Sequence, residues 1–155
     1  MKPLMSVIYA SRSTEDFHEH EIPDLLKQAR LSNARHELTG MLLYIGGSFL
    51  QVLEGYPEMV EAVFDTIVRD KRHTQATLIA KETIPERAYE GWTLCHKTLD
   101  PVEAGELIAE PDYFSSNTWV ARLDPGRAKK LLSACRVQWQ IEHRSGKYRT
   151  LGRTA

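Results

Sequence analysis

The stretch from Leu38 to Gly55 constrains the fold of this chain most strongly. It consists of two apolar runs that meet at Gly46-Gly47. Glycine pairs readily adopt the positive φ angles that tight hairpin turns require. The stretch therefore predicts an antiparallel hairpin, with a buried strand on either side of the turn.

Within this hairpin, Gln51 is a polar residue on an apolar strand face. Side chains alternate between the two faces of a strand, so Gln51 shares its face with Phe49 and Leu53. The other face carries Leu50, Val52 and Glu54. Burying a carboxamide without partners costs about 1–3 kcal/mol. Gln51 must therefore hydrogen-bond to another group, and the identity of that group bears on function.

Hydrophobic periodicity predicts further elements on both sides of the hairpin. Strands are expected at 4–10, 76–84 and 92–97, and helices at about 23–33 and from 57 to the charged run at 69–72. The resulting order is β-α-β-β-α-β-β. It predicts an α+β, ferredoxin-like sheet with two helices on one face.

The second face of this sheet is also apolar and needs a cover. A C-terminal helix is expected at about 125–136, beginning at Asp124-Pro125, with Ala128, Leu131, Leu132 and Cys135 at helical spacing. Beyond it, Val137, Trp139 and Ile141 alternate with polar residues. We therefore divide the chain into a domain at 1–97 and an extension at 98–155. The extension is expected to pack on the second sheet face or at the interface of a homo-oligomer.

Composition indicates an ordinary globular protein. Of the 155 residues, 42% are hydrophobic and 26% are charged, and two cysteines predict no disulfide framework. The net charge is −1, yet residues 143–155 carry four basic residues and no acid, so residues 1–142 carry −5. An acidic body argues against a nucleic-acid partner. The basic tail is expected to be a frayed C-terminus.

Other sequence signals argue against several classes of protein. We see no cleavable signal and no apolar run near the ~18–20 residues that span a bilayer, which predicts a cytoplasmic protein without membrane contact. His18 and His20 are only two metal ligands in a polar loop, so no metal is expected. P-loop, dinucleotide and Gly-x-Ser-x-Gly motifs are all missing. These observations favour binding over catalysis, and we do not expect an enzyme.

Three residues remain as candidates for a functional site: Tyr9, Asn33 and Gln51. Tyr9 ends the inward run of the first strand, and Asn33 ends the first helix. From composition alone, a core tyrosine with a satisfied hydroxyl and a helix-terminal asparagine is the simplest interpretation.

A wider set of motifs changes that interpretation. They are Tyr9-Ala10-Ser11, Asn33 to Gly40, Leu42-Leu43-Tyr44, Phe49 to Gly55, Asp70 to His73, and Gly91-Trp92. In this order and spacing, residues 4–97 resemble the BLUF family, the sensors of blue light using flavin. The resemblance does not extend to the residues from Thr98 onward.

The resemblance implies a non-covalently bound FAD, or FMN in its place, between the two helices over the sheet. Asn33 would hydrogen-bond the polar edge of the ring, and Gln51 would lie between Tyr9 and the flavin N5/O4 edge. The remaining implied contacts are Leu25 and Phe49 beside the ring, Ser32 as a weaker contact, and Asp70, Arg72 and His73 near the pyrimidine end. Arg30 receives no role and is expected to be a surface arginine.

The resemblance also implies a photocycle. After blue light excites the flavin, Tyr9 would give up an electron and then a proton. Recombination would leave Gln51 rotated or tautomerised, with a stronger hydrogen bond to flavin O4 and a red-shifted signalling state. The output would pass through the fifth strand and Trp92, which lies inside or outside the pocket or packs in the core. Leu94 occupies a position where the family often has methionine, and leucine lacks the thioether acceptor and is less adaptable.

We therefore predict a short blue-light photoreceptor that signals to an unknown downstream effector protein, since 58 residues leave no room for an output domain. Two alternatives remain open. One is a light-independent flavoprotein, and the other is a flavin-free, ferredoxin-like adaptor for protein interaction.

Overall fold

The computed structural model describes residues 3–143, so the basic residues of the tail at 144–153 lie outside the described part of the chain. Its elements in chain order are β1 (Leu4–Ser13), the 3-10 helix η1 (Glu19–Glu21), α1 (Ile22–Arg35), β2 (Thr39–Ile45), β3 (Ser48–Gly55), α2 (Pro57–Val68), β4 (His73–Ile84), β5 (Cys95–Leu99), α3 (Pro101–Leu107), α4 (Trp119–Arg122) and α5 (Pro125–Glu142).

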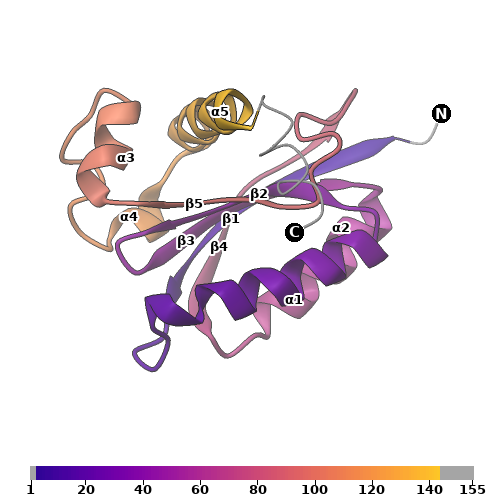
Figure 1. Cartoon of the computed structure of the whole chain (residues 1–155), viewed down its shortest axis with the longest axis horizontal. Helices are drawn as coiled ribbons and strands as arrows, with labels where there is room; N and C mark the ends of the chain where they lie inside the picture. The colour runs from indigo at the N-terminus through magenta and orange to yellow at the C-terminus, as the bar shows by residue number, and fades with distance from the viewer. Residues whose placement is uncertain (1–2, 144–155) are drawn as a thin grey trace.

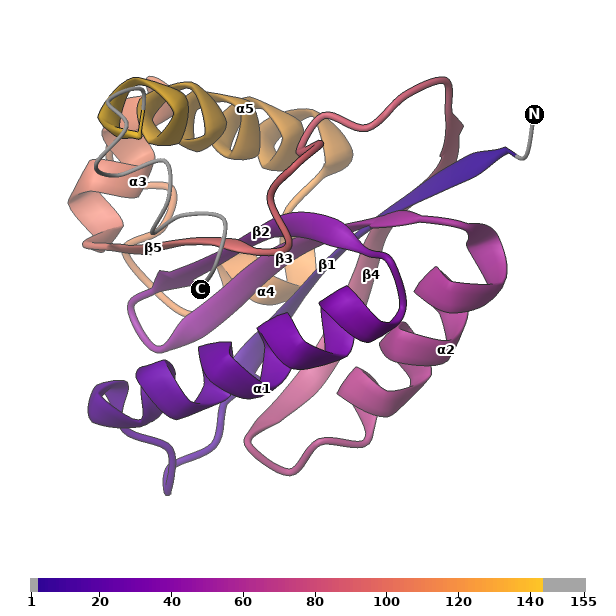
Figure 2. The same cartoon turned by 45° about the vertical axis from the view of Figure 1, so that its right-hand side comes forward.

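These strands form one mixed five-stranded sheet in the order β4-β1-β3-β2-β5. β1 and β3 are antiparallel, as are β1 and β4, and β2 and β3, whereas β5 runs parallel to β2. Helices α1 and α2 lie side by side on one face, and α5 lies on the other (Figures 1 and 2). The predicted α+β, ferredoxin-like fold is confirmed.

The central hairpin forms as its sequence indicates. Gly46 and Gly47 have φ angles of 54° and 86°, and Ile45 pairs with Ser48 across them, so the turn has two residues. Positive φ at both positions is the geometry that glycine tolerates best. β3 becomes the central strand of the sheet and is buried along its whole length.

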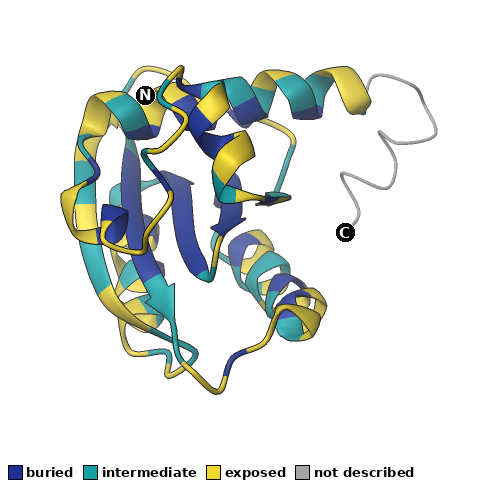
Figure 3. Cartoon of the chain, turned by 90° about the vertical axis from the view of Figure 1, so that its left-hand side faces the viewer, coloured by how far each residue is buried: buried dark blue, intermediate teal, exposed yellow. Residues whose placement is uncertain are grey.

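The two faces of the sheet bury separate cores. Towards α1 and α2, Leu42 and Phe49 pack with Ile22 and Leu26, while Val7 and Leu53 pack with Val60 and Val63. The opposite face buries the larger cluster, in which strand residues meet side chains from all three C-terminal helices: Ile8, Leu43, Leu50, Val52, Ala104, Trp119, Leu131, Leu132 and Cys135. Figure 3 shows the buried strands between the two layers of helices. The extension thus covers the second sheet face from within the same chain.

Several predicted boundaries were wrong. The fifth strand was expected at 92–97, but β5 begins at Cys95, so Trp92 and Leu94 precede it. The fourth strand begins at His73 rather than Ala76, because β4 pairs with the extended end of β1 at Ser13.

The C-terminal helix is also longer than expected. α5 begins at the predicted cap, where the Asp124 carboxylate accepts the Arg127 N–H, and it continues to Glu142. Trp139 is buried one turn after Cys135, so the helical spacing carries on through the residues whose alternation suggested otherwise. Helix α3 was missed, although Asp100 and Glu103 form a capping box around Pro101.

Gly40 offers a test of the close approach between β2 and β3. A Cβ at this position would lie 2.0 Å from the Val52 carbonyl oxygen, which is backbone and cannot rotate away. We expect Gly40→Ala to lower the free energy of unfolding by about 3 kcal/mol, measured by urea denaturation. Gly126→Ala is the control, because it lies in the first turn of α5 and should change stability by less than about 1 kcal/mol. Equal stability of the two variants would contradict this packing.

Candidate functional site

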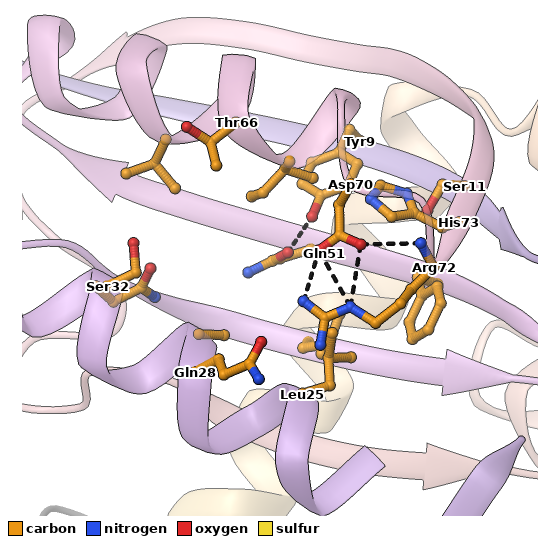
Figure 4. A pocket seen from close by; sticks show the side chains of 16 residues that line it. Tyr9, Ser11, Leu25, Gln28, Ser32, Gln51, Thr66, Asp70, Arg72 and His73 are labelled. Atoms are coloured by element: carbon orange, nitrogen blue, oxygen red, sulfur yellow. Dashed lines mark hydrogen bonds and ion pairs between the residues drawn. The ribbon is translucent and has the colours of Figure 1, made fainter. Parts of the chain in front are cut away.

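A cavity of about 230 Å³ opens between α1 and α2 over the middle of the sheet (Figure 4). It is lined by side chains from both helices, three central strands and the start of β4: Tyr9, Ser11, Leu25, Gln28, Ala29, Ser32, Asn33, Leu42, Phe49, Gln51, Val63, Thr66, Ile67, Asp70, Arg72 and His73. Its lining combines apolar side chains from the sheet and both helices with polar and charged groups. Such cavities are typical sites for small ligands.

Tyr9 and Gln51 meet at the floor of this cavity. They are paired residues on the neighbouring strands β1 and β3, and the Tyr9 hydroxyl donates a hydrogen bond to Gln51 Oε1. The two residues are 3% and 4% exposed, so water does not compete for this bond. The partner that Gln51 requires is therefore Tyr9, and its NH2 group remains available to a further acceptor.

Burial and charge keep Tyr9 protonated at rest. Burial, with a smaller contribution from the nearby Asp70 carboxylate, raises the pKa of the Tyr9 phenol far above its usual value. Tyrosinate is therefore inaccessible near neutral pH. The phenol can release its proton only to a bonded acceptor and only when its own electronic state changes, and Gln51 Oε1 is that acceptor.

Asn33 lies in the last turn of α1, where it is buried and lines the cavity. Its Nδ2 donates to the Thr93 carbonyl at 3.0 Å, which ties the segment before β5 to the cavity wall. Among the described residues, no donor reaches its Oδ1. The carboxamide can therefore accept a hydrogen bond from a ligand while it still holds Thr93.

An ion pair closes the end of the cavity near the start of β4. Arg72 Nε and Nη2 donate to the Asp70 carboxylate at distances between 2.6 and 3.2 Å. The hydrogen bonds from Arg72 lower the pKa of Asp70, and the same bonds raise the pKa of Arg72. Burial lowers the pKa of His73, so its imidazole is neutral at pH 7. This end of the cavity thus combines a fixed ion pair with a neutral ring.

Two buried polar atoms along the cavity lack a protein partner. Ser11 Oγ and His73 Nδ1 have no hydrogen bond within residues 3–143, and both side chains line the cavity. A buried polar atom without a partner costs about 1–3 kcal/mol. The cavity is therefore suited to a flat, largely apolar ligand with donors and acceptors at its edges, and a flavin ring has that chemistry.

All the side chains that the sequence implied as flavin contacts line this one cavity: Leu25, Ser32, Asn33, Phe49, Gln51, Asp70, Arg72 and His73. Sequence reasoning did not anticipate Gln28 and Thr66, which lie on α1 and α2 facing the opening (Figure 4). Gln28 is one helical turn from Leu25 and from Ser32, so helical spacing could have identified it.

Trp92 and Leu94 do not line the cavity. Trp92 packs against the core on the second sheet face, with its ring 6.4 Å from that of Trp139 on α5. Leu94 is buried on the other side, among Phe49, Leu42 and Leu26. The two residues of the expected relay therefore lie on opposite faces of the sheet, in the segment leading to β5.

Arg30 was expected to be a surface arginine, and this was wrong. It is half-buried on α1, and its Nε donates to the Leu94 carbonyl at 3.2 Å. Together with the Asn33 bond to Thr93, it fixes two successive carbonyls of the segment before β5. The helix that borders the cavity therefore also holds this segment.

His96, on β5, should make stability depend on pH. Burial, with a smaller contribution from the Arg30 guanidinium, lowers the pKa of His96 to about 4. An unfolded histidine titrates near 6.5, so the unfolded chain binds a proton that the folded chain resists. Stability should be full above about pH 6.5 and fall as the pH approaches 4, by about 3 kcal/mol from this residue. Urea unfolding at pH 7.5 and at pH 4.5 measures this fall in the free energy of unfolding. His96→Gln should lose this part of the fall, while His73 contributes equally in both proteins. An unchanged fall in the variant would contradict this assignment.

Within residues 3–143, no group of three or more His, Cys, Asp or Glu side chains could hold a metal ion. His18 and His20 are exposed, and their rings stack on each other at 5.7 Å. No helix in the same range is long and apolar enough to cross a membrane.

Comparison with known proteins identifies the family of this chain. The family model for BLUF, described as sensors of blue-light using FAD, matches residues 4–95. The match covers more than half of the chain, which therefore belongs to the BLUF family, and the predicted resemblance is confirmed.

Curated relatives share this domain within longer proteins. The chain is 32% identical over 96 residues to the photoactivated adenylate cyclase subunit beta of Euglena gracilis, covering 61% of this chain and 11% of that protein. It is 30% identical over 86 residues to the blue light- and temperature-regulated antirepressor BluF of Escherichia coli strain K12, covering 56% of this chain and 21% of that protein. The chain thus spans only a small part of these relatives.

Solved structures share the fold over most of the chain. BlsA in its photo-activated state has a TM-score of 0.75 at 24% identity, covering 86% of this chain and 95% of that one. BlrB, a BLUF protein in its dark state, has a TM-score of 0.68 at 25% identity, with 89% and 98% covered. Klebsiella pneumoniae BlrP1, solved with FMN and cyclic diGMP, has a TM-score of 0.59 at 24% identity, with 88% and 35% covered. BLUF domains thus bind FAD or FMN.

Proposed function

We propose that this protein is a blue-light photoreceptor that binds a flavin in the cavity between α1 and α2 and signals through a hydrogen-bond switch at Gln51. The observation that carries the proposal is the buried hydrogen bond from the Tyr9 hydroxyl to Gln51 Oε1 at the cavity floor. A redox-active phenol bonded to a rotatable amide beside a ligand cavity is suited to coupled electron and proton transfer.

The residues that line the cavity match the needs of FAD, with FMN as the alternative. Asn33 and Gln51 would hydrogen-bond the polar edge of the ring, because an amide both donates and accepts. Leu25 and Phe49 would pack on its apolar surface, and His73 Nδ1 would gain the partner that it lacks among the described residues. When bound, the flavin supplies the blue-light absorption and the electron acceptor.

Tyr9 and Gln51 would carry out the switch. The Tyr9 phenol gives up an electron and then passes its proton along the existing bond to Gln51 Oε1. When the charges recombine, Tyr9 regains both, and the Gln51 carboxamide is left rotated or tautomerised. The protein returns to its original redox state with a changed hydrogen bond, which suits a reversible sensor.

The signal would leave through the segment before β5 towards a partner protein that remains to be identified. Asn33 holds the Thr93 carbonyl, Leu94 packs beside Phe49, and Trp92 packs beside Trp139 on α5. A change in hydrogen bonding at the cavity can therefore bias the position of α5. Val137 and Ile141, which are 45% and 60% exposed on α5, support protein contact there, either with the effector or with a second copy in a homo-oligomer.

We further propose that the chain itself is not an enzyme. The matched domain is 11% of the Euglena cyclase subunit, so the activity in that protein's name need not belong to the shared part. The signal would thus be read by protein contact rather than by turnover in this chain.

An absorption spectrum of the purified, flavin-loaded protein tests the proposal. We expect a reversible red shift of the flavin band under blue light, with recovery in the dark and no covalent adduct. A bound flavin without a light-induced shift would favour the light-independent flavoprotein. Colourless protein that takes up neither FAD nor FMN would favour the flavin-free adaptor.

A further inference from the structure

The segment between β4 and β5 has to cross the whole sheet. These two strands form opposite edges, so residues 85–94 pass across the end of the sheet on the side of α5 (Figure 2). The middle of that crossing lies at the end of β3, the central strand. Glu54 is the last residue but one of β3, and its side chain points away from the cavity.

The Glu54 carboxylate holds the crossing segment by accepting hydrogen bonds from its backbone N–H groups. Its Oε2 accepts the Ala88 N–H at 2.9 Å, and its Oε1 accepts the Tyr89 N–H at 2.7 Å. Thr39 Oγ1 donates to the same Oε1 at 2.9 Å. Arg87 completes the arrangement, because its Nη1 donates to Thr39 Oγ1 and to the Glu54 carbonyl. The segment is therefore fixed to both β2 and β3 at this point.

The chemistry of this site favours a carboxylate. Glu54 is 2% exposed, and a buried charge is stable only when donors surround it. Three donors converge on its two oxygens, and an ionised carboxylate only accepts hydrogen bonds. A glutamine of the same shape would turn an NH2 group towards one of them and leave a backbone N–H without a partner. The site thus distinguishes glutamate from its neutral isostere.

The anchored residues lead directly to the cavity wall. The Tyr89 carbonyl accepts the Trp92 N–H at 3.0 Å, which closes a turn through Gly91, whose φ is 85°. The next residue, Thr93, presents its carbonyl to Asn33 Nδ2. Only three residues lie between the Glu54 anchor at Tyr89 and the Asn33 bond at Thr93, and the turn between them is itself hydrogen-bonded.

We propose that Glu54 is a positioning residue for the flavin site. It sets the path of residues 87–93 and so places the Thr93 carbonyl where Asn33 can bond it, which in turn orients the Asn33 carboxamide in the cavity. This inference rests on the proposed function, because the orientation of Asn33 matters only if a flavin binds in the cavity. Glu54 acts from the face of the sheet opposite the cavity and does not touch the ligand.

Nuclear magnetic resonance of the flavin-loaded protein in the dark tests this assignment with Glu54→Gln. We expect flavin to remain bound, because Glu54 does not line the cavity. We expect the Ala88 and Tyr89 amides to exchange about tenfold faster or more, since one hydrogen bond to a charged group is lost. The decisive readout is the Asn33 side-chain NH2 signal, which should shift as its bond to Thr93 lengthens. Glu82→Gln, an exposed strand glutamate paired with Lys129, should leave that signal unchanged.

The proposal would be overturned if the Ala88 and Tyr89 amides of Glu54→Gln exchanged faster while the Asn33 signal stayed identical to wild type. Glu54 would then stabilise only the backbone that it contacts. Should Glu54→Gln fail to fold, Arg87→Met removes two bonds at the same point and should shift the Asn33 signal in the same direction; an unchanged signal there would overturn the proposal equally. Failure of the proposed function is a separate result, because it appears as a flavin band in the wild type that does not respond to light.

Discussion

Tyr9→Phe should abolish the light-induced red shift while leaving the flavin bound. The ring of phenylalanine fills the same space beside Phe64, so the cavity keeps its shape. The hydroxyl that donates to Gln51 Oε1 is lost, and with it the proton that the switch transfers. Stability should fall by about 1–2 kcal/mol, because Gln51 Oε1 is left buried without its donor. Light-minus-dark absorption difference spectra measure the main effect.

Tyr44→Phe is the matched control for this experiment. Tyr44 is also buried on a central strand and packs beside Phe49 and Phe17, but it does not line the cavity. It should keep both the flavin and a full red shift. A normal photocycle in Tyr9→Phe would exclude Tyr9 as the donor and remove the basis of the proposed mechanism.

Gln51→Leu removes the acceptor of the same hydrogen bond and should abolish the light-induced change to a similar extent. Leucine is close in volume and suits the apolar face shared by Phe49 and Leu53, so the flavin should still bind. No side chain then remains to receive the Tyr9 proton or to form a new bond after illumination. Light-minus-dark infrared spectra of the flavin C4=O stretch should therefore show none of the downshift expected in the wild type.

Gln28→Leu supplies the control for the amide. Gln28 lines the same cavity from α1 but is exposed, and Tyr9 pairs with Gln51 rather than with it. This variant should retain the infrared downshift. Retention of the same downshift in Gln51→Leu would rule out Gln51 as the switch, whatever the behaviour of Tyr9.

Local sequence was sufficient for most of the fold. The Gly46-Gly47 turn, the alternation along β3 and the Asp124 cap of α5 depend on neighbouring residues, and the structure has all three. Boundaries that depend on distant pairing were wrong. The start of β5 is decided by where β2 offers a parallel partner, and Met41 meets Cys95 rather than Trp92. No periodicity within residues 92–97 contains that information.

The side chains that the sequence named line one cavity, whereas the residues that hold the neighbouring segment in place were not named. Gln51 could be named because its polarity stands out on an apolar strand, and Asn33 could be named because it begins a motif that resembles the family. Arg30 and Glu54 could not, because each bonds backbone groups of the segment before β5 that lie more than thirty residues away. An arginine on a helix and a glutamate at a strand end can equally well face solvent. Only the path of residues 85–94 supplies the backbone groups that bond Arg30 and Glu54.

The hairpin from Leu38 to Gly55 separates the features that local sequence determines from those that the tertiary structure decides. Its sequence by itself determined the turn, the buried strands and the presence of an amide that needs a partner, because these follow from φ preferences, alternation and the cost of burying an unpaired polar group. Only the tertiary structure decided which partner meets it, since the β1–β3 register places Tyr9 opposite Gln51. The same fold also decided that Glu54, three residues along, would hold the segment that leads to β5. Register and crossing path arise from packing of the whole sheet, and no single stretch of sequence specifies them.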